Sequence, residues 1–447
     1  MHPTRLCLAV LCAMLPLSQG HAAAMDRSGQ SVAALFQKGN YAEIGYSWLS
    51  PEVAGTDTSG NAVPEMAKDY EFITGAIKVD AAPGTALAFL YDQPYGADGE
   101  YTGNNNFVSA TGNPFGTTGA TLAEVKSHSY SLLVNQALNS NLSVHAGLSY
   151  QTVEGDVQLR GPAYSVFNGY NLGMDSAGGL GWVLGGAFEK PDIALRAALT
   201  YRSEITTHHD TVETNNFAQN ANVAAIGAGV AGGTAAIPAT LTALNTQLVT
   251  AQAANNTAAI TQLTGKINQL GRLYALSQIS PQHGSSTNVT TPQSINLDFQ
   301  TGVMPGTLAF ANVRWVDWSG FSISPNTYTS TTAAMTGTGL PIVSYSKDQW
   351  SAQVGLGHKF NDLLSASVAA LWDSGAGNPV TTLGPTEGYT GVGVGVKITP
   401  TPALDVSLGA RYLWLGDAEA QLPNGTVVGS FKDNTAVAAG IKLGYHF

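Results

Sequence analysis

The chain has 447 residues, of which 44% are hydrophobic and only 11% are charged, whereas soluble domains carry about 25% charged residues. Its 30 acidic residues outnumber its 19 basic ones, which argues against nucleic acid as a partner. No stretch is apolar for the roughly 18 residues that a membrane helix needs. Low charge without a hydrophobic helix, together with 51 glycines, predicts an all-β membrane protein.

Residues 1–24 have the pattern of a secretory signal peptide. Arg5 provides a positive charge, a short apolar core follows, and an A-x-A motif ends at Ala24. The two cysteines of the chain, Cys7 and Cys12, both lie in this segment. We therefore expect cleavage near Ala24, a mature chain without disulfides, and localisation in the outer membrane of a Gram-negative bacterium.

Residues 25–40 do not alternate between apolar and polar positions. A short apolar cluster, Val32 to Phe36, lies between polar flanks. Ahead of a barrel, such a segment predicts a short N-terminal hatch inside the lumen. Leu35 and Phe36 would either touch the tail of a ligand or simply seal the lumen.

From Tyr41 onward, the chain contains fourteen stretches that alternate with a period of two, as strands of a barrel do. Short and long connections alternate between them, which predicts periplasmic turns and extracellular loops. An even number of strands closes the sheet and removes its edges. We therefore expect residues 41–447 to form a 14-stranded antiparallel transmembrane β-barrel. The predicted strands are 41–53, 67–79, 85–94, 126–138, 141–159, 178–189, 192–213, 289–303, 307–323, 348–360, 363–374, 388–399, 403–420 and 435–447.

Charged residues in these strands fall mostly on the face opposite to the apolar one. Their parity predicts that they point into the lumen and form mutual salt bridges that make the wall rigid. This group contains Arg196, Arg202, Glu204, Arg314 and Arg411. The stretch 307–323 is the exception, because Arg314 has the same parity as Leu308 and Phe310. Either a bulge or a wrong register would explain it.

Two further features of the strands have more than one interpretation. Pro94 cannot donate a ladder hydrogen bond, so the third strand is either kinked there or ends there. His208, His209 and Asp210 lie at a strand end, where some outer-membrane proteases carry Asp and His. Because adjacent strand residues point to opposite faces, we expect solvated rim residues, and no catalytic residue, cofactor or metal site is predicted.

The longest loop, 214–288, has apolar residues at helical spacing. Asn255 and Asn256 would divide it into a helical hairpin, 239–254 and 257–277, outside the membrane. Its apolar stripes would pack on each other, on neighbouring loops or on a ligand.

The last strand, 436–447, has Val437, Ile441 and Leu443 on its apolar face and ends on Phe447. It is similar to the C-terminal signal by which the barrel-assembly machinery recognises outer-membrane proteins.

Four segments together resemble the long-chain fatty acid transporters of the FadL and toluene-porin type. They are DRSGQSVAALFQKGNYAEIGYSWLSPEV after the signal peptide, LTYRSEI (199–205), WVDWSGF (315–321) and the C-terminal strand. The resemblance implies a monomeric barrel that takes up hydrophobic molecules from outside and releases them sideways near a kinked third strand. It differs from the family in its shorter hatch, which lacks an Asn-Pro-Ala motif.

The resemblance also implies candidate ligand-binding residues. Arg160 lies near the position of a carboxylate-binding arginine of the family, with Tyr164 and Phe167 following in the loop, and Lys347 is a second candidate cation. Both cations would otherwise be rim charges that face water or lipopolysaccharide. The expected function is uptake of long-chain fatty acids or other hydrophobic compounds. Aromatic hydrocarbon uptake, an aqueous general porin and a barrel enzyme are the alternatives.

Overall fold

The computed structural model describes residues 24–111, 113 and 117–447, so the predicted signal peptide lies outside the described residues except for Ala24. The main sheet has 17 strands, because three of the fourteen barrel strands are each interrupted once. In chain order, with interrupted strands joined by a solidus, they are β1 (Tyr41–Glu52), β4 (Tyr70–Ala82), β5/β6 (Thr85–Asp92, Gly96–Glu100), β9 (Leu122–Ala137), β10 (Leu142–Leu159), β11 (Tyr170–Lys190), β12/β13 (Leu195–Arg202, Ile205–Thr214), β14/β15 (Gln282–Thr291, Ser294–Met304), β16 (Thr307–Val316), β19 (Gln349–Lys359), β20 (Leu364–Asp373), β22 (Glu387–Thr401), β23 (Leu404–Gly416) and β26 (Thr435–His446).

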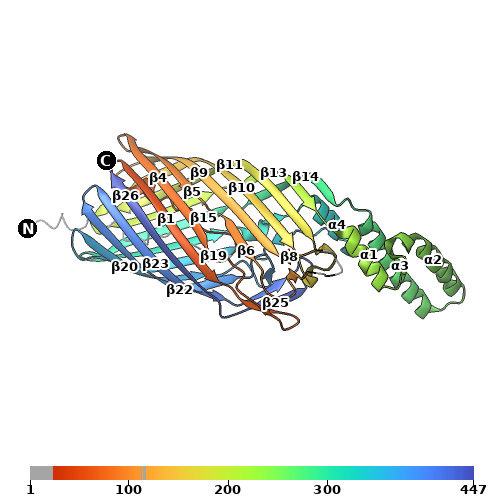
Figure 1. The fold of residues 1–447 in the computed structure, drawn as a ribbon. Helices are drawn as coiled ribbons and strands as arrows, with labels where there is room; N and C mark the ends of the chain where they lie inside the picture. Colours follow the sequence, from red (N-terminus) through yellow and green to blue (C-terminus); the bar gives the residue numbers. More distant parts are fainter. Residues whose placement is uncertain (1–23, 112, 114–116) are drawn as a thin grey trace, which may run out of the picture.

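The sheet closes on itself, because β1 pairs with β4 on one side and with β26 on the other. Tyr41 lies opposite His446, so the barrel begins and ends at the same rim (Figure 1). The short connections lie at this rim, and the long ones lie at the other rim. The predicted 14-stranded antiparallel barrel is confirmed.

Inward and outward faces follow the predicted parity. On β12, Leu199 is 53% exposed on the outside, whereas Arg196 and Thr200 are buried on the inside. Outward-facing tryptophans near the far rim are about half exposed, and they are Trp182, Trp350, Trp372 and Trp414. Trp318 differs, because it is fully buried under the loops. The wall therefore presents an apolar band edged by aromatic rings.

The shared parity of Arg314 with Leu308 and Phe310 in the stretch 307–323 requires neither a bulge in this strand nor a wrong register. β16 pairs with β19 without a shift, and Leu308, Phe310 and Arg314 all point inward. The strand ends at Val316 and continues into a short 3-10 helix. The lumen is apolar at one height of this strand and polar at another, so alternation along a single strand could not show which face was inside.

Small sheets and helices cover the far rim. The strands are β2 (Gly55–Asp57), β3 (Ala62–Val63), β7 (Val108–Ser109), β8 (Gly119–Ala120), β17 (Ser322–Ile323), β18 (Val343–Ser344), β21 (Val380–Thr381), β24 (Ala418–Gln421) and β25 (Val427–Phe431). The helices there are α1 (Phe217–Gly227), α2 (Ile237–Ala253), α3 (Thr257–Ser277) and α4 (Asn326–Thr336), with the 3-10 helices η2 (Pro162–Phe167), η4 (Gly233–Ala236) and η5 (Trp318–Gly320). Two further 3-10 helices lie elsewhere: η1 (Ala33–Phe36) packs inside the barrel ahead of β1, and η3 (Pro191–Ile193) forms the short connection between β11 and β12. No helix in the described part of the chain is long and apolar enough to cross a membrane.

The predicted helical hairpin is present as α2 and α3, which extend beyond the barrel (Figure 1). Asn255 has a positive φ of 51°, and the side chain of Asn256 accepts a hydrogen bond from the N–H of Ala259 at the start of α3. Leu244 and Leu270 are buried in one cluster together with α1. The apolar stripes therefore pack on each other.

Candidate functional site

The third barrel strand is interrupted where the sequence contains Pro94. β5 ends at Asp92 and β6 begins at Gly96. Both parts pair with β9, whereas only β5 pairs with β4. The strand therefore remains bonded to β9 along its length and separates from β4 after the interruption. The interpretation of Pro94 as a kink is therefore correct, and Pro94 suits the position because it has no N–H to donate.

On the side of β4, this interruption leaves an opening in the ladder, which we call the window. The ladder stops at the pair Gly75–Tyr91 and resumes at the bridge Ala67–Gly99. Side chains cross the interval. The Tyr70 hydroxyl donates to the Asp98 carbonyl at 3.0 Å and accepts from the Asp98 N–H at 2.8 Å. These hydrogen bonds of the Tyr70 side chain can break while the backbone hydrogen bonds of the neighbouring ladder remain intact.

The other neighbour of the kink is the N-terminal segment, residues 24–36, which we call the plug. Its Arg27 N–H donates to the Pro94 carbonyl at 2.7 Å, and the Gly96 N–H donates to the Met25 carbonyl at 3.0 Å. The backbone groups that the kink turns into the lumen are thus satisfied by the plug. Further along, Leu35 is buried against the barrel interior. The predicted lumenal hatch therefore starts at the kink and crosses the lumen.

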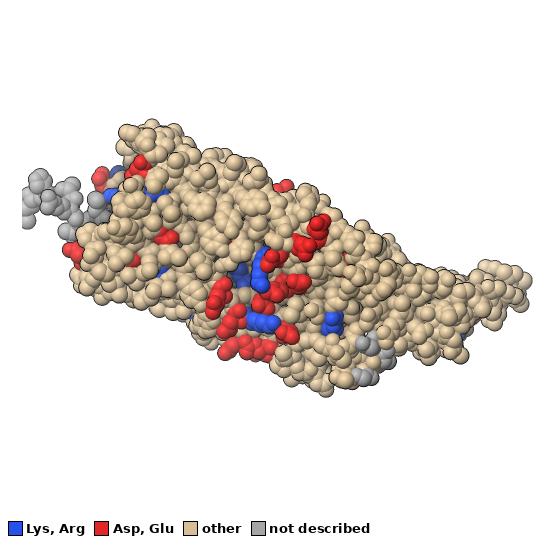
Figure 2. Space-filling view, turned by 45° about the horizontal axis from the view of Figure 1, so that its top comes forward, with Lys and Arg blue, Asp and Glu red and all other residues tan. Residues whose placement is uncertain are grey.

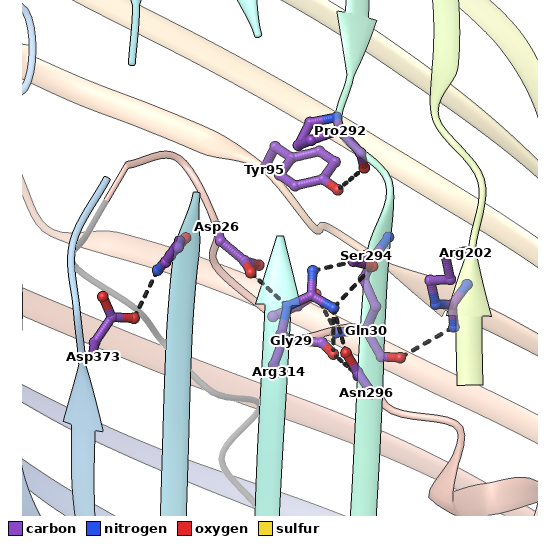
Figure 3. A network of polar contacts seen from close by, with 12 residues as sticks. Asp26, Gly29, Gln30, Tyr95, Arg202, Pro292, Ser294, Asn296, Arg314 and Asp373 are labelled. Carbon is purple, nitrogen blue, oxygen red and sulfur yellow. Dashed lines mark hydrogen bonds and ion pairs between the residues drawn. The ribbon is translucent and has the colours of Figure 1, made fainter. Parts of the chain in front are cut away.

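A buried ion pair fixes the plug to the opposite wall. The Arg314 Nε lies 2.6 Å from the Asp26 Oδ2, and both side chains are 1% exposed. Arg314 also donates to the Gln30 side chain at 3.1 Å and to Asn296 at 2.7 Å. Figure 3 shows Arg314 at the centre of this network, with Arg202 donating to the Gln30 carbonyl from another strand.

The arginines predicted to form mutual salt bridges within the wall contact other residues as well, and the mutual salt bridges stay a prediction. Arg314 pairs with the plug, whereas Arg196 and Arg411 donate to the glutamines Gln300 and Gln353. Glu204 is exposed between β12 and β13 and does not face the lumen. The alternation along the strands correctly predicted that the four arginines point inward. Their partners, however, come from the plug and from neutral residues of other strands. The spacing of residues along one strand does not reveal such partners.

Two small, mainly apolar cavities lie on the outer side of the plug. The first, of about 40 Å³, is lined by Met25, Val125, Met174 and Ile323 among others. The second, of about 60 Å³, lies beside the window and is lined by Arg27, Met66 and Tyr70 among others. Both cavities share the wall residues Ala24, Ala97, Leu383 and Gly384. A thin apolar partition therefore separates the loop region from the window.

The lumen on the other side of the plug contains more charged groups. Its cavity of about 130 Å³ is lined by charged residues of both signs, including Glu43, Asp92 and Arg411, and also by apolar residues such as Leu90 and Phe310. Some of these charges are paired across the wall, as are Lys442 and Glu43 at 3.1 Å. The plug thus separates two small apolar cavities on its outer side from a larger cavity with charged lining, which also reaches Gly75 and Tyr91 at the edge of the window.

The cations predicted to bind a head group do not line these cavities. The guanidinium of Arg160 donates to the carbonyls of Leu159 and Tyr170 and to the side chain of Asn171. Burial lowers its pKa. Lys347 is exposed at the rim. A head-group role stays a prediction for both, and their contacts favour the alternative of rim charges.

The remaining predicted residues divide between the loops and the plug. Tyr164 donates to Thr382 and is buried in the loop core, where burial raises its pKa to about 12. Phe167 packs against Tyr328 in the same region. Phe36 lies at the plug, edge-on to the ring of His145. These positions are compatible with sealing, and contact with a ligand remains a prediction.

His208 and His209 do not form a joint site. His208 is exposed, whereas His209 is buried and contacts Thr207 and the Asp175 carbonyl. Their side chains lie on opposite faces of β13, as the strand geometry predicts. No group of three or more metal-ligating side chains is present within residues 24–111, 113 and 117–447.

Sequence reasoning missed the plug residues that matter most for this arrangement. Asp26 and Arg27 lie before the apolar cluster and have no periodic signal of their own. The available signal was that the segment begins with two charged residues outside any alternating pattern. Charged side chains need partners if they become buried, so this feature predicts contacts with the barrel wall.

No protein-family model and no curated protein matches the sequence. Solved structures do match its fold over nearly the whole length. A FadL homologue from Pseudomonas aeruginosa has a TM-score of 0.64 at 14% identity and covers 100% of this chain and 99% of its own. The toluene transporters TodX of P. putida and TbuX of Ralstonia pickettii have TM-scores of 0.59 and 0.55, each at 10% identity with 98% and 99% coverage. The chain therefore has the fold of the FadL homologue and of these toluene transporters, which in this chain is a 14-stranded antiparallel barrel.

Proposed function

We propose that this protein is an outer-membrane channel that takes up hydrophobic compounds and releases them sideways through the window. One observation carries the proposal. A mainly apolar cavity lies beside an interruption of the wall and shares its partition with a second apolar cavity, whereas the cavity beyond the plug is lined by several charged residues of both signs.

The outer surface of the barrel supports a place in a lipid bilayer. Exposed leucine, isoleucine and valine side chains form a band on the wall, with aromatic residues near both rims. Such a surface is stable in lipid and would aggregate in water. The outer membrane is the bilayer that holds antiparallel barrels with this alternation.

The polarity of the two routes decides between them. A hydrophobic molecule gains about 0.8 kcal/mol for each methylene that it buries away from water. To move along the barrel axis, it would have to leave the apolar cavities and pass Asp92, Asp298 and Arg411. To move through the window, it passes Tyr70 and the exposed ion pair of Lys68 and Glu100 before it reaches the apolar band of the wall. Figure 2 shows charged side chains gathered in one patch of the barrel wall. The sideways route ends in that apolar band, whereas the route along the barrel axis ends in water, so we expect the barrier of the sideways route to be lower.

Movement of the plug or the partition is part of the proposal. The cavities of about 40 and 60 Å³ are smaller than the roughly 150 Å³ cavity that accommodates benzene in an engineered protein core. A ligand must therefore displace Ala24, Leu383 or neighbouring groups of the partition before it passes. The structure corresponds to the closed state of this channel.

The test is uptake of a labelled alkane or toluene by cells that lack their own channels for hydrophobic compounds. The protein should raise the uptake, and Ala97→Trp, which fills the partition, should abolish that increase. Ala309→Trp on the outward face of β16 is the control and should retain it. Purified protein in a planar bilayer should carry little ionic current, because the plug closes the lumen. Unchanged uptake with Ala97→Trp, or a large steady current, would contradict the proposal.

A further inference from the structure

The plug ends in an aromatic side chain that lies against a polar part of the wall. Phe36 is edge-on to the ring of His145, with ring centroids 5.7 Å apart. The guanidinium of Arg196 lies over the same phenyl ring, with Cζ at 5.0 Å from its centroid. Phe36 is half-buried and shortly precedes Asn40, whose carbonyl accepts a hydrogen bond from Phe447. The ring therefore lies toward the rim where the barrel begins and ends, at the other end of the plug from the kink.

The strand register explains how the wall receives this ring. Gly185 of β11 lies between His145 of β10 and Thr200 of β12. A β-carbon on Gly185 would overlap Nε2 of His145, so glycine leaves the space through which the imidazole crosses β11 and reaches the Thr200 hydroxyl at 3.0 Å. The next inward-facing row of β11 and β12, on the side of Arg196, has two small side chains that leave room for a ring. They are Ala187 and Ala198.

Four polar side-chain atoms in this part of the wall are buried without a hydrogen-bond partner among residues 24–111, 113 and 117–447. They are Nδ1 of His145, Nη1 of Arg196, Oγ of Ser143 and Oδ1 of Asn135. Ser143 lies on the same inward face as His145, and Asn135 of β9 is directly opposite His145. The phenyl ring of Phe36 has no polar group that could pair with these atoms. The closed state therefore leaves them unpaired, which is energetically unfavourable.

We propose that the site around Phe36 binds a phenol, a single aromatic ring with a hydroxyl group, which takes the place of the Phe36 side chain. Its ring lies between His145 and Arg196 and keeps the cation–π contact. A hydroxyl both donates and accepts hydrogen bonds, so it accepts from Arg196 or Ser143 and donates to Asn135. A carboxylate only accepts, so it would leave the Asn135 oxygen unpaired. The mixture of donors and acceptors thus favours a hydroxyl group.

This inference goes beyond the proposed function, because a compound that leaves through the window does not reach this site. Phe36 and the ligand cannot occupy the site together, so Phe36 is a competitor built into the chain. The apparent dissociation constant equals the intrinsic constant divided by the fraction of protein in which Phe36 has left. Removing the phenyl ring should therefore tighten binding, whereas removing the cation should weaken it.

The test is binding of 4-fluorophenol to purified protein in detergent, followed by fluorine NMR. Phe36→Ala should tighten binding roughly tenfold or more, the factor that corresponds to a site vacant in about a tenth of the parent molecules or fewer. Arg196→Gln should weaken binding roughly twofold to thirtyfold, the factor that corresponds to a cation–π contact. Phe188→Ala, on the outward face of β11, is the matched control and should bind as the parent does. Heat-dependent gel migration verifies that each variant is folded.

Competition with unlabelled compounds tests the ligand class. Phenol should displace the probe, whereas benzene, which lacks the hydroxyl group, and cyclohexanol, which lacks the aromatic ring, should require much higher concentrations. Displacement by benzene as effective as that by phenol would overturn the assignment of a hydroxyl. Unchanged or weaker binding in Phe36→Ala, unchanged binding in Arg196→Gln, or no binding to any folded variant would overturn the inference. None of these results bears on the uptake of toluene, which is measured separately.

Discussion

The ion pair between Asp26 and Arg314 provides the sharpest test of how the plug is held. In Asp26→Asn, Arg314 keeps its bonds to Gln30 and Asn296 but loses its counter-charge. Both side chains of the pair are 1% exposed, so water cannot replace the lost interaction. Breaking a pair of this kind costs about 3–5 kcal/mol. An exposed pair such as Lys68–Glu100, with side chains 45% and 43% exposed, contributes about 0–1 kcal/mol.

The loss acts mainly on the plug, because Asp26 belongs to it. A destabilisation of 3–5 kcal/mol raises the population of the released plug by roughly a hundredfold to a thousandfold or more, since 1.4 kcal/mol is a factor of ten. In planar bilayers, Asp26→Asn should therefore show frequent openings with ionic current, whereas the parent stays mostly closed. Glu100→Gln is the control and should behave as the parent does.

A double variant separates the ion pair from general damage. Asp26→Asn combined with Arg314→Met removes both charges, and replacing both partners of a buried pair is often nearly neutral. It should open less often than Asp26→Asn alone. If Asp26→Asn stays as closed as the parent, or if the double variant opens at least as often as the single variant, the reasoning about this pair is refuted.

Three other substitutions test separate parts of the structure. Tyr70→Phe removes the hydroxyl that bridges to Asp98 and costs about 1 kcal/mol per hydrogen bond; uptake of toluene by cells should rise several-fold, and a decrease would contradict its role as a closure of the window. Leu35→Ala removes a fully buried plug residue at about 2–5 kcal/mol; bilayer current should increase, and unchanged closure would show that Leu35 does not seal the lumen. Asn256→Ala removes the cap of α3 and should cost about 1 kcal/mol of helix stability; proteolysis of the hairpin should become faster while toluene uptake stays unchanged, and lost uptake would assign the hairpin a part in transport.

The barrel itself could be predicted from the sequence because lipid imposes a simple rule on every strand. Leu199 faces outward and Thr200 inward on β12, and the same alternation recurs around the ring. The hairpin of α2 and α3 could be predicted for a similar reason, since Asn255 and Asn256 interrupt one helical period. These features depend on neighbours in the sequence, so the sequence displays them directly.

The interior could be predicted only in part, because its contacts join distant segments. Asp26 and Arg314 are 288 positions apart, and no local pattern connects them. Arg160 was selected by resemblance, yet its guanidinium bonds to its own hairpin. Arg27 was overlooked because a single charge in a short segment has no period. Which cation lies beside the window depends on the path of the plug, and only the structure gives that path.

The most direct test of sideways release is to lock the window. The two cysteines of the chain lie in the predicted signal peptide, so introduced cysteines can be crosslinked selectively. Ile73→Cys and Gln93→Cys, whose parent residues are joined by a hydrogen bond of 2.8 Å across the window, would be linked with a short bismaleimide. The same linker between Leu199→Cys and Leu297→Cys, which face each other in the closed ladder of β12 and β15, is the control.

Toluene uptake by cells is then measured before and after crosslinking. Sideways release predicts that the link across the window reduces uptake to the level of cells without the protein, while the control link leaves it unchanged. Uptake that continues at full rate through a crosslinked window would contradict the account, because the compound would then have to leave along the barrel axis.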